Sequence, residues 1–258
     1  MPFVDVGDAR LHVEVDGTGE PVTVLAHGLT NTCRELARLT PLIEGTKVRF
    51  CFRGHGQSTS PETGYRFADF ARDLEAVASE YGATRAFGTS LGAGAICRIL
   101  SENPDRFERL VFLLPAGLDR PFRHKEDFIK TAEILESKPR DEAIEAILGD
   151  PNRLETYARQ PWMREFDRET WDHADMHALA AAIRGVIEDF PVPDRELMRK
   201  VQTPVLLICR EGDPIHPAAL GRTLVDLMPN AELLCYRDDV EMFEALPDIV
   251  QRVGAFLA

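Results

Sequence analysis

The sequence predicts an α/β protein with a doubly wound, mostly parallel sheet and a helical cap inserted between two of its strands. Three observations lead to this prediction. Short continuous apolar runs, typical of strands buried on both faces of a sheet, alternate with segments of helical periodicity. A G-x-S-x-G pentapeptide stands between one such run and a helix-forming segment. In the middle of the chain, residues 119–199 contain helical material and no strand-like run.

The elements follow from these patterns in chain order. The alternating segment Leu11–Val15, with Phe3–Val6 before it, predicts an antiparallel hairpin at a sheet edge. The continuous apolar runs after it predict parallel strands at Val22–Ala26, Val48–Phe52, Ala86–Gly88, Leu110–Leu114, Val205–Cys209 and Leu233–Tyr236. Helical periodicity predicts core helices at Phe67–Tyr81, Leu91–Glu102, Ala218–Met228 and Val240–Leu257. This β-α-β-α order implies right-handed crossovers.

The interval 119–199 interrupts that order. It is rich in charge and predicts helices, among them Lys125–Ser137, Arg140–Leu148 and Asp175–Glu188. It is too long to be a loop inside a compact domain. Because open α/β sheets bind ligands beyond the carboxyl ends of their strands, we expect a cap at residues 119–199 over a core of residues 1–118 and 200–258.

Length and charge narrow the class of protein. The chain has 258 residues, enough for one large domain, and a formal net charge of −13. Nucleic acid and anionic membrane surfaces would repel it, so neither is expected as a partner. The sequence contains no recognisable signal peptide and no apolar run of membrane-spanning length, which favours a cytoplasmic protein.

The cysteines indicate a reducing environment. Their number is odd and no C-x-x-C pair occurs: Cys33, Cys51, Cys97, Cys209 and Cys235. Three of them fall in expected strands, where cysteine behaves as a small hydrophobic residue. We expect reduced, buried thiols rather than a disulfide or a metal site.

The pentapeptide Gly88-Thr89-Ser90-Leu91-Gly92 is the most informative motif. It matches the nucleophile elbow, a sharp strand-to-helix turn that exposes a serine hydroxyl above a sheet. Glycines flank the serine because side chains there would collide with neighbouring backbone. The serine itself is expected in a strained conformation.

Four further motifs follow expected strands or close the chain: His27-Gly28-Leu29, Arg53-Gly54-His55-Gly56-Gln57-Ser58, Gly212-Asp213-Pro214, and Glu244-Ala245-Leu246-Pro247-Asp248. Together with the elbow, they resemble the α/β-hydrolase superfamily, in particular its small bacterial members with a helical cap. The resemblance covers nearly the whole chain, and the cap is its least specific part. It implies the α/β-hydrolase fold.

The resemblance also implies roles for individual residues. Ser90 would be the nucleophile, and the backbone N–H groups of Leu29 and Leu91 would form the oxyanion hole. Asp213 would orient the catalytic base. The pocket would be supported by the motif residues His27, Gly28, Gly88 and Gly92, and the segment Arg53–Ser58 would brace the sheet edge.

The base departs from the family pattern. In that pattern a histidine follows the last strand, but the sequence has no histidine after His216. Counting back from Glu244 places Asp239 at the histidine position, and a carboxylate is a feeble base toward a serine hydroxyl. His216 is a possible substitute base, although its place on the loop of Asp213 favours a locally hydrogen-bonded loop residue.

These residues predict a serine-type hydrolase acting on a small carboxylic ester, thioester or related acyl substrate, with an atypical or impaired base. Two alternatives stay open: a non-hydrolytic lyase or cyclase that uses the oxyanion hole, and a small-molecule-binding module without catalysis. No cofactor or metal is expected. The oligomeric state is not determined by the sequence.

Overall fold

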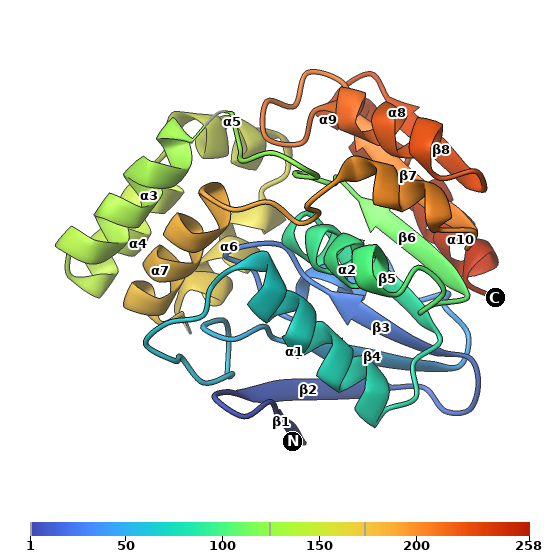
Figure 1. Ribbon diagram of the computed structural model, residues 1–258. Helices are drawn as coiled ribbons and strands as arrows, with labels where there is room; N and C mark the ends of the chain where they lie inside the picture. The colour runs from blue at the N-terminus through green and yellow to red at the C-terminus, as the bar shows by residue number, and fades with distance from the viewer. Residues whose placement is uncertain (1, 124, 173) are drawn as a thin grey trace.

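The computed structural model describes residues 2–123, 125–172 and 174–258. Within this part of the chain, eight strands form one sheet in the order β1-β2-β4-β3-β5-β6-β7-β8 (Figure 1). The strands are β1 (Phe3–Asp5), β2 (Arg10–Asp16), β3 (Val22–Ala26), β4 (Thr46–Phe50), β5 (Arg85–Thr89), β6 (Arg109–Leu113), β7 (Val205–Arg210) and β8 (Ala231–Tyr236). Strands β1 and β2 form the expected antiparallel hairpin, and β2 also pairs antiparallel with β4. From β4 onward, the strands β4-β3-β5-β6-β7-β8 pair with their neighbours in parallel.

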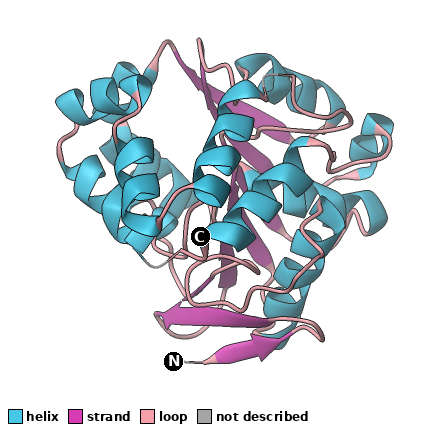
Figure 2. Ribbon diagram, turned by 90° about the vertical axis from the view of Figure 1, so that its left-hand side faces the viewer, coloured by secondary structure: helices cyan, strands magenta, loops and turns pink. Residues whose placement is uncertain are grey.

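Helices cover both faces of the parallel sheet, which confirms the predicted α/β fold class (Figure 2). The helices α1 (Phe67–Glu80), α2 (Leu91–Glu102) and α8 (Ala218–Leu227) share one apolar cluster with alternate strand residues such as Leu110 and Phe112. On the other face, α10 (Leu246–Phe256) and the short helix η1 (Glu35–Arg38) pack on the intervening residues, such as Val111. Burial on both faces is the reason these strands read as continuous apolar runs.

Among the described residues between β6 and β7, five α-helices form the cap, and Figure 1 shows them gathered at one end of the sheet. They are α3 (Glu126–Ser137), α4 (Arg140–Leu148), α5 (Pro151–Arg159), α6 (Trp162–Asp172) and α7 (Met176–Ile187). They enclose an apolar cluster of their own, in which Trp171 and Ile183 are almost fully buried. Helices α5 and α6 add to the three cap helices that the sequence singles out. The following short helix η2 (Arg195–Lys200) contacts α2 and α8 of the core.

The end of the chain differs from its prediction in one respect. The single helix expected at Val240–Leu257 is two helices, α9 (Asp239–Glu244) and α10. Pro247 lies in the first turn of α10, where the lack of an N–H group is tolerated, whereas it would break a continuous helix. None of the helices in the described residues has the length and apolarity that a bilayer crossing requires.

Candidate active site

Ser90 occupies a strained turn between β5 and α2. Its backbone φ and ψ angles are 47° and −104°. Residues other than glycine rarely adopt a positive φ angle. A Cβ atom at Gly88 would lie 2.5 Å from the backbone nitrogen of Ala93, and one at Gly92 would collide with the carbonyl group of Ala26. Both glycines are therefore needed for the turn to pack between β3 and α2.

A continuous series of hydrogen bonds leads away from the Ser90 hydroxyl. The Nε2 atom of His216 lies 3.0 Å from Ser90 Oγ. The Nδ1 atom of the same ring lies 3.1 Å from Asp213 Oδ2. A serine, an imidazole and a carboxylate in this order are the three parts of a nucleophile–base–acid triad.

The position of His216 corrects the expectation from the sequence, which favoured a merely local role for this residue. Asp213 and His216 are three residues apart on the loop after β7, and the carboxylate fixes the turn between them. Its Oδ1 atom accepts the backbone N–H groups of Ile215 and His216, both at 2.9 Å. This turn directs the imidazole to the carboxyl edge of the sheet, where it meets Ser90.

Asp213 is held as a carboxylate. Burial by itself disfavours the charged form, but the hydrogen bonds and charge of His216, together with Arg210 at 2.8 Å, outweigh it and hold the pKa of Asp213 well below its usual range. An ionised acid beside Nδ1 favours the ring tautomer in which Nδ1 carries a proton and Nε2 can accept one from Ser90.

The structure places Asp239 apart from this series. It is the first residue of α9, and its Oδ2 atom lies 3.0 Å from Arg159 at the end of α5. Among the described hydrogen bonds, none joins Asp239 to Ser90 or His216. The residue at the aligned position of the family histidine therefore makes an ion pair between the core and the cap.

Two buried histidines shape the backbone on the other side of Ser90. His27 accepts the N–H group of Phe52 at Nε2 (3.0 Å), and its Nδ1 atom faces the carbonyl oxygen of Gly28 (2.7 Å). His55 accepts the N–H group of Thr30 at Nε2 (3.2 Å). Burial lowers the pKa of His27 to about 3 and that of His55 to about 4, so both rings are neutral near pH 7.

These contacts hold the segment that contains Leu29, one of the expected oxyanion donors. Leu91, the other, is the first residue of α2. Its N–H group is among those at a helix start that lack an intrahelical acceptor. The positive end of the helix dipole points in the same direction and favours an anion there.

Glu35 is a residue of this region that the sequence did not suggest. Its carboxyl group accepts the N–H group of Gly28 at 2.6 Å and the side-chain amide of Asn31 at 2.8 Å. Burial raises its pKa to about 7. A Cβ atom at Gly28 would lie 3.3 Å from Glu35 Oε1 and 3.6 Å from the Cβ atom of Ser90, so the three residues are close neighbours. In the sequence, Glu35 looks like any charged residue of a solvated turn.

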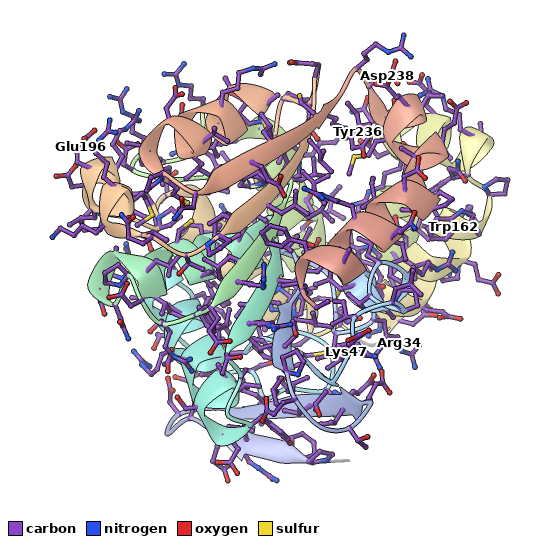
Figure 3. The ribbon with its side chains drawn as sticks, turned by 90° about the vertical axis from the view of Figure 1, so that its right-hand side faces the viewer. Arg34, Lys47, Trp162, Glu196, Tyr236 and Asp238 are labelled. Carbon is purple, nitrogen blue, oxygen red and sulfur yellow. The ribbon has the colours of Figure 1, made fainter. Side chains whose placement is uncertain are left out.

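A cavity of about 720 Å³ lies next to the Ser90 turn, between the core and the cap, with Thr89 and His216 in its lining. His216 reaches it from the core, and cap residues of α3, α5 and α6 form much of its wall. Trp162 lines it, with the guanidinium group of Arg38 stacked 3.8 Å from the ring centre. Figure 3 shows Trp162 beside the C-terminal helices, and Met242 and Leu246 of these helices line the same cavity.

Comparison with known proteins shows the family of the chain. The sequence model described as "Alpha/beta hydrolase family" matches residues 23–245. A 2-(acetamidomethylene)succinate hydrolase of Mesorhizobium japonicum is 33% identical over 243 residues, which cover 85% of this chain and 81% of that protein.

Two solved structures are similar over nearly the whole chain. The enol-lactonase of Burkholderia xenovorans LB400 superposes with a TM-score of 0.83, at 20% identity and 99% coverage of both chains. An esterase of Exiguobacterium antarcticum superposes with a TM-score of 0.79, at 15% identity and the same coverage. At these identities the two structures establish the fold.

Proposed function

The chain belongs to the alpha/beta hydrolase family, and from the geometry at Ser90 we propose that it is a serine hydrolase of a small carboxylic ester, thioester or related acyl compound. The observation that supports this proposal is the hydrogen-bonded series Ser90–His216–Asp213 at 3.0 and 3.1 Å. In this proposal His216 serves as the base, although it precedes the position at which the family has its histidine. The proposed enzyme therefore has all three groups of the triad and need not be impaired.

The proposed reaction has two halves. His216 Nε2 takes the proton of Ser90 as Oγ attacks the acyl carbon, and Asp213 stabilises the imidazolium that forms. The N–H groups of Leu29 and Leu91 stabilise the oxyanion; each such donor is typically worth about 2.7–4 kcal/mol. The imidazolium then protonates the leaving group, and an acyl-enzyme remains on Ser90. Water, deprotonated by His216, releases the acid and restores the serine.

The cavity supports a small, partly apolar substrate. Its volume of about 720 Å³ lies within the roughly 300–1,000 Å³ typical of small-molecule sites. Apolar side chains such as Ile134, Ile147 and Leu246 form part of its wall. The related 2-(acetamidomethylene)succinate hydrolase acts, by its name, on a small acyl compound. We also propose a cytoplasmic location, since four of the five cysteines are buried and all five are free thiols.

Covalent labelling tests the proposal against binding without catalysis. A fluorophosphonate probe should label the wild-type protein at one residue, and peptide mapping should place the label on Ser90. The Ser90→Ala variant should take up no label while keeping the wild-type circular dichroism spectrum. A folded wild-type protein that remains unlabelled would exclude an activated serine and favour a binding module.

A further inference from the structure

A second group of reactive side chains lies at the boundary between the core and α6, outside the lining of the Ser90 cavity. It consists of His12, Cys33 and Cys51, whose ring nitrogen and two sulfur atoms all lie within 4.8 Å of one another. Each residue is at most 5% exposed. None of the three has a role in the hydrolysis proposed above.

Three segments of the core bring these residues together. His12 lies on β2, and the N–H group of Cys51, just after β4, donates to its carbonyl oxygen at 3.0 Å. Cys33 lies on the loop after β3, and its own N–H group donates to Cys51 Sγ at 3.4 Å. Its sulfur atom lies 4.0 Å from His12 Nδ1. The three donors therefore converge from segments that the sheet holds in place.

The backbone leaves room for the sulfur of Cys51. Gly56 has a φ angle of 53°, and a Cβ atom there would lie 2.5 Å from Cys51 Sγ. By contrast, the buried Cys97 lies within the apolar core cluster, and its thiol takes part in none of the described side-chain hydrogen bonds. Ordinary packing accounts for Cys97, whereas Cys33 and Cys51 face polar groups.

We propose that His12, Cys33 and Cys51 form a binding site for one thiophilic divalent metal ion, of which Zn²⁺ is the physiological candidate. Two sulfurs and one imidazole nitrogen are a donor set that Zn²⁺ prefers in proteins. Zn–S bonds of about 2.3 Å and Zn–N bonds of about 2.0–2.1 Å place tetrahedral ligands somewhat less than 4 Å apart. Small movements of side chains would bring the observed atoms to that spacing.

The fourth ligand position would face a cavity of about 210 Å³ that these three residues line together with Glu14, Gln57 and residues of α6. The acidic residues on this wall are Glu14, whose carboxylate lies 3.3 Å from Arg49, and Glu169 of α6. The cavity also offers a path by which an ion or a water molecule reaches the site. An ion there would link β2 with the loops that follow β3 and β4, and so stabilise the core beneath the cap.

Cobalt titration tests this site, because Co²⁺ bound by thiolates in tetrahedral geometry gives sulfur-to-metal charge-transfer and intense visible absorption. The protein is reduced, freed of metal and titrated with Co²⁺ without oxygen. One Co²⁺ per chain should bind with this spectrum, and Zn²⁺ should displace it. Cys33→Ser and Cys51→Ser should each lose the thiolate bands, whereas Cys97→Ser and Cys235→Ser should keep them. The proposal is overturned if the folded wild-type protein gives no such bands, or if they survive in Cys51→Ser.

Thermal melting gives a second readout that does not depend on catalysis. Zn²⁺ should raise the melting temperature of the wild-type protein and of Ser90→Ala equally, but not that of Cys51→Ser. A disulfide between Cys33 and Cys51 in protein purified without reductant, with no Co²⁺ bound after reduction, would make the two cysteines a redox pair and refute a metal site. If fluorophosphonate does not label Ser90, the hydrolase proposal fails, but the Co²⁺ spectrum and the melting temperatures are unaffected. The hydrolase proposal and the metal-site proposal can therefore be refuted independently.

Discussion

Ser90, His216 and Asp213 are coupled through single hydrogen bonds, so the loss of one partner should disable the others. Ser90→Ala and His216→Ala should each lower kcat/KM by roughly 10²–10⁴-fold or more. Assistance by a general base is typically worth a factor in this range. The double variant should be scarcely worse than either single one, because residues that act as a unit are not additive. Ester hydrolysis by the four proteins measures this.

His177→Ala is the matched control for that experiment. His177 is an exposed histidine on α7 and lines neither cavity. Its replacement should leave kcat/KM near the wild-type value. If His216→Ala retained most of the activity while Ser90→Ala lost it, the base would have to be another group.

Glu35 should make stability depend on pH in a direction opposite to that of most carboxylates. Its pKa is about 7 in the folded protein and 4.5 in the reference state. The folded state therefore binds the proton more tightly, and the contribution to stability is complete below pH 4.5 and lost as pH rises through 7. Urea unfolding at pH 5 and pH 8 should show Glu35→Gln losing less stability than the wild type over this interval. An equal loss in both proteins would mean that Glu35 ionises normally.

At the scale of elements, helix α1 is joined to the loop after β4 by a fully buried ion pair. Arg53 and Asp73 are both 0% exposed at the side chain and lie 2.7 Å apart, and Asp8 adds a second carboxylate at 2.9 Å. Asp73→Ala leaves a buried guanidinium group with one partner fewer. Removing one member of such a pair costs about 3–5 kcal/mol.

The free energy of unfolding in urea measures that cost, with Glu102→Ala as the comparison. Glu102 pairs with Arg98 on α2, and its side chain is mostly exposed. Breaking an exposed pair of this kind should cost only about 0.3–0.5 kcal/mol. Similar values for the two variants would show that Arg53 finds other compensation.

The elements were largely predictable because the parallel strands are buried on both faces and therefore read as apolar runs. The split between α9 and α10 follows from Pro247, a signal present in the sequence. The proposed base, His216, was not predictable in the same way. Spacing placed Asp239 at the family position, whereas the turn that directs His216 to Ser90 depends on two backbone N–H groups bonded to Asp213. Glu35 has no sequence signal, because only burial distinguishes it from a surface acid.

At the scale of the whole molecule, the ion pair Arg159–Asp239 joins the cap to the core beside the cavity of about 720 Å³. Both side chains are partly exposed, so Asp239→Asn should change the free energy of unfolding by less than about 1 kcal/mol. It should raise KM by loosening α5 over the cavity, and leave the rate of fluorophosphonate labelling nearly unchanged. Steady-state kinetics and labelling of the same preparation separate these effects.

Asp213→Asn is the contrasting variant, since an amide beside Nδ1 favours the wrong tautomer of the imidazole. Comparable changes in other hydrolases lower kcat by roughly 10⁴-fold. Slow labelling in Asp239→Asn, similar to that in Asp213→Asn, would instead assign Asp239 to the reaction.

The placement of acid and base on one turn changes how the site can fail. In a site whose three groups come from three separate segments, any one of them can drift out of register independently. Here the carboxylate and the imidazole lie three residues apart on one loop, and the backbone N–H groups of Ile215 and His216 both donate to Asp213 Oδ1. A displacement of that loop would carry both groups together and change the distance from the imidazole to Ser90. In the proposed reaction, the Ser90–His216 distance of 3.0 Å would therefore be the contact most sensitive to a movement of this loop.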